Sequence, residues 1–95
     1  METNNIYSIE EYANSINIPP SELIGRSRKQ IYSIPRQVYL FYLYNQKIPI
    51  QKIGKKFGRH HSTVIHSVKN ISNLIDVKDK IVTKYLSSLE IFSLM

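Results

Sequence analysis

Residues 50–64 read IQKIGKKFGRHHSTV, and they give the clearest indication of the fold in this chain of 95 residues. Its apolar residues recur at helical spacing up to Gly58, and helical spacing resumes directly afterwards. A residue as small as Gly54 lets two helices cross closely, and Gly58 permits the backbone turn that joins them. We therefore predict a helix-turn-helix over about 50–74, with its second helix beginning near His60.

Helical spacing, with proline and glycine at the boundaries, predicts six helices in all. We expect them at about 8–18, 20–25, 35–46, 50–57, 60–74 and 77–92. The first begins with a capping box made by Ser8 and Glu11. Pro35 suits the first turn of the third helix, so the preceding residues 26–33 are expected to form a basic loop.

The third helix is expected to be the central and most buried element, because its apolar residues cover most of its circumference. These residues are Val38, Leu40, Phe41, Leu43 and Tyr44. The last helix is expected to pack back on the core. The residues that would do so are Ile81, Tyr85, Leu89 and Phe92. The sequence thus predicts the all-α fold class, as a small helical bundle that forms one domain over residues 1–95.

The charged residues are distributed unevenly along the chain, whose net charge is +6. No acidic residue lies between Leu23 and Ile75, whereas ten of the thirteen lysines and arginines do. Globular surfaces usually mix the two signs, so an acid-free basic stretch between acidic ends is typical of a surface that binds nucleic acid. A basic surface that does not bind nucleic acid would carry the same net charge, so this alternative stays open on charge alone.

Several function classes are disfavoured by what the sequence lacks. It contains no cysteine, no G-x-x-x-x-G-K-[ST] nucleotide-binding motif, and no grouped carboxylates in the basic stretch to hold Mg²⁺ for nuclease chemistry. His60, His61 and His66 have no HExxH motif and no nearby carboxylate, so we expect no metal, no cofactor and no enzyme activity. No apolar run approaches the ~18 residues of a membrane span, and the lack of cysteine fits a reducing cytoplasm, so we expect a soluble, cytoplasmic protein. Binding of DNA by the basic stretch would associate it with the nucleoid.

Two sequence blocks narrow the generic pattern to a family. The first is Ile34-Pro35-Arg36-Gln37 before an apolar helix, and the second is Ile53-Gly54-x-x-Phe57-Gly58 followed by Arg59-His60-His61-Ser62-Thr63-Val64-Ile65-His66. Over about residues 6–74, the chain resembles the C-terminal DNA-binding domain, domain IV, of the bacterial chromosomal replication initiator DnaA. The resemblance implies a Trp-repressor-like helical bundle that binds an asymmetric DnaA box in duplex DNA as a monomer. It also implies that the helix-turn-helix reads the major groove while an arginine of the basic loop enters the minor groove.

The resemblance also assigns roles to residues at matching positions. Residues 61–63 look like base or phosphate contacts of the recognition helix, and Arg28 looks like the minor-groove residue. Arg36 and Gln37 look like phosphate clamps. Lysines on the first helix of the motif would meet the sugar-phosphate backbone. The full set of expected DNA-binding residues is Arg28, Arg36, Gln37, Lys52, Lys55, Lys56, Arg59, His60, His61, Ser62, Thr63 and Lys69.

The sequence departs from the family pattern at three positions of the motif. Gly58 stands alone where the family has two glycines, which predicts a tighter turn. His60 stands where the family has an aspartate, whose carboxylate only accepts hydrogen bonds and suits a cytosine amino group. We expect an altered preference at that base pair, worth about 1–3 kcal/mol if the contact is direct. Ser62 replaces the usual threonine and so loses a methyl group.

The chain also lacks the ATPase domain that full-length initiators of this kind carry upstream. It is therefore expected neither to hydrolyse ATP nor to drive strand opening. The chain is either an excised domain or a stand-alone protein, and its start at Met1 slightly favours the second.

Other interpretations of these residues stay open on the sequence alone. Ser62 and Thr63 would also serve as helix caps, and Arg28 would also serve as a solvated loop residue beside other cations. A small transcriptional regulator or mobile-element repressor would use the same DNA reader. A protein-interaction adaptor would instead dock an acidic partner on the basic face.

Overall fold

The computed structural model describes residues 8–93, with side chains described as far as residue 89, and within that range it contains six helices and no strand. Their bounds are Ile9–Ser15 (α1), Pro20–Ile24 (α2), Gln30–Asn45 (α3), Ile50–Phe57 (α4), His61–Asp76 (α5) and Lys80–Ser93 (α6). The predicted all-α fold class is confirmed. None of the helices in the described range is long and apolar enough to cross a membrane.

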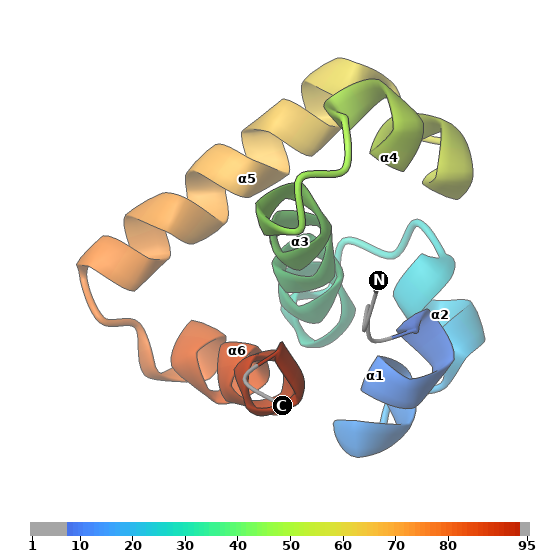
Figure 1. Ribbon diagram of the computed structural model, residues 1–95. Coiled ribbons are helices and arrows are strands. Elements are labelled where there is room, and N and C mark those ends of the chain that lie inside the picture. The colour runs from blue at the N-terminus through green and yellow to red at the C-terminus, as the bar shows by residue number, and fades with distance from the viewer. Residues whose placement is uncertain (1–7, 94–95) are drawn as a thin grey trace.

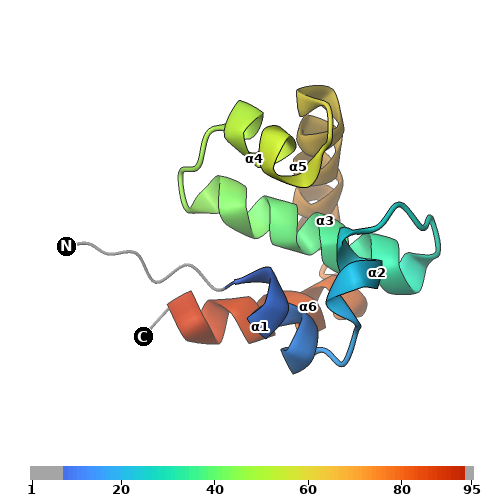
Figure 2. The same cartoon turned by 90° about the vertical axis from the view of Figure 1, so that its right-hand side faces the viewer.

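Helix α3 lies at the centre of the bundle, as Figure 1 shows. In Figure 2, α4 and α5 lie on one side of α3, and α1 and α6 lie on the other. Helix α2 packs on the amino-terminal half of α3, where Arg36 reaches its last turn. This arrangement leaves one side of the bundle to the helix-turn-helix, which α3 supports from beneath.

The first helix begins as predicted and ends earlier than predicted. The hydroxyl oxygen of Ser8 accepts from the Glu11 amide at 3.1 Å, and the Glu11 carboxylate accepts from the Ser8 amide at 3.2 Å, so the capping box is confirmed. Helix α1 then ends at Ser15. Asn17 takes a left-handed backbone conformation with φ of 60°, which cannot continue a right-handed helix.

Helix α3 begins at Gln30, so the predicted start at Pro35 is wrong and this proline lies inside the helix. Pro35 is only the sixth residue of α3, and it removes one backbone hydrogen bond, which its amide would have made to the carbonyl of Ile31. The ring is buried in the core, and its carbonyl oxygen accepts from the Tyr12 hydroxyl at 2.9 Å. The basic loop is therefore shorter than predicted and consists of residues 26–29.

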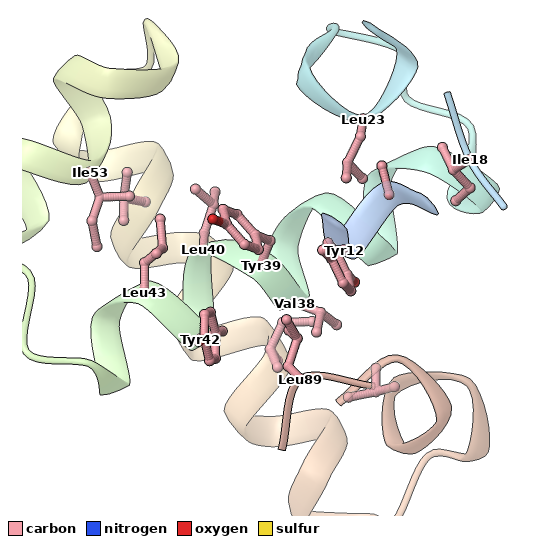
Figure 3. Packing of buried hydrophobic residues seen from close by; sticks show 14 residues of the cluster. Tyr12, Ile18, Leu23, Val38, Tyr39, Leu40, Tyr42, Leu43, Ile53 and Leu89 are labelled. Carbon is pink, nitrogen blue, oxygen red and sulfur yellow. The ribbon is translucent and has the colours of Figure 1, made fainter. Parts of the chain in front are cut away.

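The core is a single cluster built around α3 (Figure 3). The Tyr39 ring stacks on the Tyr12 ring of α1, with centroids 5.4 Å apart, and meets the Phe57 ring of α4 edge-on at 5.9 Å. Tyr42 is also buried, whereas the predicted burial of Tyr44 is wrong because that side chain is 43% exposed. Tyr44 lies outside the arc of α3 that the neighbouring helices cover.

Helix α6 begins at Lys80, three residues later than predicted, because the Asp79 carboxylate caps it by accepting from the Val82 amide at 3.0 Å. The predicted burial of Leu89 is confirmed, and Val82 is fully buried as well. The predicted burial of Ile81 is wrong, since this side chain is 56% exposed and Val82 occupies the core-facing position instead. The predicted packing of Phe92 lies outside the described side chains.

Candidate nucleic-acid interface

Helices α4 and α5 form the predicted helix-turn-helix, joined by Gly58, Arg59 and His60. Gly58 has φ of 62°, a left-handed conformation that glycine adopts without strain. A Cβ atom at Gly54 would lie 2.6 Å from the carbonyl oxygen of Arg59, so any side chain there would force the turn or the helix to shift. The Arg59 amide also donates to the Gly54 carbonyl at 2.8 Å. The turn is thus held directly against α4, which fixes the angle at which α5 leaves it.

The amino end of α5 is exposed and is capped by a histidine. His60 Nδ1 accepts from the Ser62 amide at 3.2 Å and lies 2.8 Å from the Ser62 hydroxyl oxygen. The rings of His60 and His61 have centroids 4.2 Å apart. Thr63 is exposed too, while the next residue, Val64, is fully buried. The cap is therefore His60, and the interpretation of Ser62 and Thr63 as caps is wrong.

Within residues 8–93 there is no group of three or more histidine, cysteine, aspartate or glutamate side chains placed to hold a metal ion. His61 lines a hollow of about 630 Å³ between the end of α3, the start of α4 and α5, beside apolar side chains such as Ile48 and Ile50.

The basic loop and the turn of the helix-turn-helix are joined by two arginines that reach in opposite directions. Arg26, in the loop, donates from Nη2 to the carbonyl oxygen of Gly58 at 2.9 Å. Arg59, in the turn, donates from Nη2 to the carbonyl of Ile24 at 3.0 Å and also to the next carbonyl along the chain. One bond thus joins the basic loop to the turn, and the other joins the turn to the end of α2. The bonded residues are more than thirty positions apart in the sequence.

Arg36 of α3 braces the same loop from a third direction. Its Nε donates to the carbonyl of Leu23 at 2.7 Å, its Nη1 to that of Ser27 at 2.9 Å and its Nη2 to that of Glu22 at 3.0 Å. The carbonyls of Glu22 and Leu23 belong to the carboxyl end of a helix, where no intrahelical amide reaches them. Arg36 thus has a structural role that the sequence did not predict, and its role as a phosphate clamp stays a prediction.

Four of the predicted contact residues line one hollow of about 320 Å³ between the basic loop and the start of α5, which we call the arginine hollow. They are Arg28, Arg36, Arg59 and Thr63. Arg26, Ser27 and Ser33 complete the lining, which includes no acidic side chain from the described part of the chain. The folded chain therefore concentrates cations and hydroxyl groups, the usual partners of a phosphate, at one point.

The electrostatics of the arginine hollow favour an anion. Burial lowers the pKa of Arg36, and the nearby Arg59 lowers it further, although Glu22 partly offsets the shift. Burial and the nearby Arg26 likewise lower the pKa of Arg59. A guanidinium nevertheless stays charged in proteins, so these cations repel one another while their hydrogen-bond partners are uncharged carbonyls. An anion in the hollow would relieve that repulsion.

Arg28 lies on the rim of the arginine hollow in a loop whose backbone is held on both sides. Ser27 is fixed by Arg36 through its carbonyl, and its hydroxyl oxygen accepts from the Lys29 amide at 3.2 Å. The Arg28 side chain is exposed and makes no hydrogen bond to another residue in the range 8–93. The guanidinium of Arg28 is thus exposed on a loop whose backbone is fixed by hydrogen bonds, and within residues 8–93 it has no hydrogen-bond partner of its own.

The predicted lysine contacts are exposed but lie apart from the arginine hollow. Lys52, Lys55 and Lys56 lie on the exposed side of α4, and the Lys56 ammonium lies 5.9 Å from the centroid of the Phe57 ring. Lys69 is exposed farther along α5. The structure thus places these four cations on the two helices of the motif.

Gln37 has partners on two helices. Its amide nitrogen donates to the Ser33 hydroxyl oxygen at 2.9 Å, and its amide oxygen accepts from Asn70 of α5 at 2.8 Å. Sequence reasoning missed Asn70, although its seven-residue spacing from Thr63 places the two on the same side of α5. It also missed the bracing role of Arg26, which charge counting alone does not reveal.

Residues 9–71 match the family model described as the bacterial DnaA protein helix-turn-helix. The chain belongs to this family. The match covers the arginine hollow, the turn and most of α5. The resemblance predicted from the two sequence blocks is therefore confirmed.

Individual relatives of the DnaA family extend this result. The chain is 41% identical to chromosomal replication initiator protein DnaA 1 of Chlamydia muridarum over 70 residues, which are 72% of this chain and 15% of that protein. It is 39% identical over 75 residues to the DnaA initiator protein of Ehrlichia ruminantium (strain Gardel), which are 76% of this chain and 16% of that protein. For the DnaA initiator protein of Thermoanaerobacter sp. (strain X514), the identity is 32% over 83 residues, 85% of this chain and 18% of the relative. The chain thus spans less than a fifth of the length of these relatives, and no solved structure matches it.

Proposed function

We propose that this chain binds duplex DNA sequence-specifically as a reader of DnaA boxes, in replication initiation or its regulation. The amino end of α5 reads base edges in the major groove, and Arg28 enters the adjacent minor groove. The observation that carries this proposal is the pair of opposed hydrogen bonds, from Arg26 to Gly58 and from Arg59 to Ile24, that hold the basic loop beside the start of α5.

The position of the arginine hollow agrees with this two-groove arrangement. Neighbouring major and minor grooves of B-form DNA are separated by one sugar-phosphate strand, so a protein that reads both must accommodate that strand between its readers. The hollow lies between the basic loop and α5 and is lined by guanidinium and hydroxyl groups. A backbone phosphate of the separating strand fits this chemistry, and such contacts set the register of a protein on the duplex.

Among the loop arginines, Arg28 is the one suited to enter a groove. The guanidinium of Arg26 donates to the Gly58 carbonyl, whereas the exposed side chain of Arg28 has no such partner within residues 8–93. Minor grooves that are narrow and rich in A·T pairs attract an inserted arginine through their negative potential. This reasoning favours Arg28 over its neighbour and supports the role that the family resemblance assigned to it.

The family membership supports the biological setting. The relatives reported above are named chromosomal replication initiator proteins. Because one chain contains both groove readers, we propose that it binds as a monomer to an asymmetric site. Full initiator activity, including ATP hydrolysis, is not part of the proposal, since the sequence has no P-loop motif.

Fluorescence anisotropy with labelled duplexes tests the proposal. We expect tighter binding to a DnaA box than to a scrambled duplex of equal composition, with log K falling by roughly 0.9 per phosphate contact for each unit of log salt. Thr63→Ala should remove most of the preference for the box. Lys80→Ala is the control, because this exposed lysine is the first residue of α6 and lies outside the motif. Equal affinity for both duplexes would refute sequence-specific reading. No binding at low micromolar concentration would refute DNA binding altogether and favour a protein-interaction role.

The minor-groove contact has its own test. Replacing an A·T pair of the bound site by G·C adds an amino group in the minor groove, and replacing it by inosine·cytosine does not. If Arg28 enters this groove, the G·C change should weaken binding and the inosine change should not, at one or two positions of the site. Arg28→Ala should abolish that difference. Persistence of the difference in Arg28→Ala would assign the contact to another residue.

A further inference from the structure

His60 has one ring nitrogen committed to its own helix. Nδ1 accepts from the backbone amide of Ser62 at 3.2 Å, and the Ser62 hydroxyl oxygen lies 2.8 Å from the same nitrogen. A backbone amide can only donate, so Nδ1 must carry a lone pair and no proton. This cap fixes the chemical state of the ring as well as its position.

The cap leaves the other ring nitrogen as a donor. In a neutral imidazole the proton that is absent from Nδ1 is on Nε2, which therefore presents an N–H group. The His60 side chain is exposed, and within residues 8–93 its Nε2 has no hydrogen-bond partner. The neighbouring His61 ring, with its centroid 4.2 Å away, restrains the orientation of the imidazole further. The structure thus presents a single oriented donor at the amino end of α5.

We propose that His60 is a specificity-determining residue whose Nε2–H reads a hydrogen-bond acceptor on a base edge in the major groove. The acceptors available there are N7 of either purine, O6 of guanine and O4 of thymine, whereas cytosine offers only a donating amino group. His60 therefore disfavours cytosine at the base it contacts. This inference rests on the proposed function, since it requires the start of α5 to lie in the groove.

The tautomer can be tested without DNA. The nitrogen chemical shifts of the His60 ring, measured by long-range proton–nitrogen NMR at a pH where the ring is neutral, should show a protonated Nε2 and a bare Nδ1. Ser62→Ala removes the hydroxyl but keeps the amide, so the same tautomer should persist in that variant. A ring that carries its proton on Nδ1 would overturn the inference whatever the protein binds.

The base preference is tested by selecting bound sites from a random duplex pool with the natural chain and with His60→Asp. Aspartate is a strong helix cap, so the helix start is preserved while the outward group becomes an acceptor only. We expect one position of the selected site to change from a base that offers an acceptor to cytosine, which offers only a donating amino group, with relative affinity shifting by roughly tenfold. Asn73→Asp, at an exposed position near the other end of α5, controls for the added negative charge.

Modified bases then identify the acceptor. A 7-deazapurine at the selected position removes only N7, so it should weaken the natural chain but not His60→Asp when N7 is the acceptor. At a selected guanine, unchanged affinity for the 7-deaza base assigns the contact to O6. If the selected base is thymine instead, O4 is the acceptor. A His60→Asp protein that binds every duplex more weakly but selects an unchanged site would show that His60 faces a phosphate, and the inference would be wrong. A natural chain that selects no site at all would overturn the proposed function, and this inference with it.

Discussion

Replacing Arg59 by lysine should uncouple the basic loop from the turn of the helix-turn-helix while keeping the positive charge. In the structure the planar guanidinium bridges the end of α4 and the end of α2, donating to the carbonyls of Phe57 and Ile24 at 3.0 Å and to a third carbonyl beside them. A lysine ammonium has no fork and reaches at most one of these oxygens in a comparable geometry. Arg59→Lys therefore separates the bracing role of this residue from its charge.

The size of the effect follows from the bonds that are lost. A net intramolecular hydrogen bond contributes about 0.5–1.5 kcal/mol, and the region is only partly buried, so losing two bonds should lower the free energy of unfolding by about 1–2 kcal/mol. The loop then has to be ordered again on DNA. Fixing the backbone of one residue costs roughly 1–2 kcal/mol, which corresponds to a loss of affinity on the order of tenfold.

A double-mutant cycle with Arg28→Ala measures the coupling. If Arg59 acts by holding the loop that carries Arg28, Arg59→Lys should weaken box binding about tenfold in the natural background and have almost no effect in the Arg28→Ala background. Lys80→Arg, an exposed change on α6 that also keeps charge and lies outside the expected DNA-binding residues, serves as the control in both backgrounds. Equal losses in the two backgrounds would mean that Arg59 contacts the DNA backbone directly, and the bracing argument would be refuted.

Two further predictions concern stability. Gly54→Ala should lower the urea-unfolding free energy by about 1–2 kcal/mol, because overpacking against the fixed Arg59 carbonyl outweighs the ~1 kcal/mol that alanine gains in a helix; an unchanged midpoint would mean that the turn can move aside. Burial raises the pKa of Tyr12 and Tyr39 well above their usual value, so the stability that their neutral forms provide is complete below about pH 10 and is lost as pH rises beyond it. Urea titrations at pH 7 and about pH 10.5 should show this loss, and Tyr12→Phe should reduce it while the exposed Tyr44→Phe should not; the same loss in both variants would assign the effect to other groups.

The fold was predictable where its determinants are local. The capping box of α1, the left-handed Gly58 and the close approach at Gly54 each depend on residues a few positions apart, and all three were confirmed. The start of α3 was not predictable from the rule that proline favours a first helical turn. Pro35 is accepted inside the helix because Tyr12, 23 residues away, uses its carbonyl and because the ring packs in the core.

The residues of the candidate site could be predicted from the sequence, but the hydrogen bonds that position them could not. Charge distribution and the family resemblance named Arg28, Arg36 and Arg59, which the structure brings to one hollow. The arginines that hold the loop donate to backbone carbonyl oxygens. Because every residue has a backbone carbonyl, the sequence does not indicate which of them accept these hydrogen bonds. His60 was missed as the cap of α5 because the residues usually found at that position are serine, threonine, aspartate, asparagine and glycine.

The choice of carbonyls as the partners of Arg26, Arg36 and Arg59 has a consequence for how fast the chain finds its target. A carboxylate partner would cancel the field of each cation at a distance, whereas a neutral oxygen leaves it intact, so the groups that hold the loop in place also attract a polyanion from afar. The same three side chains therefore raise the rate of encounter with a polyanion and hold the basic loop in place. Removing one of these charges should slow the encounter and also remove hydrogen bonds that fix the loop. Substitutions that change the rate of capture are better tolerated at Lys52 and Lys55 of α4, which are exposed and whose ammonium groups make no hydrogen bond within residues 8–93.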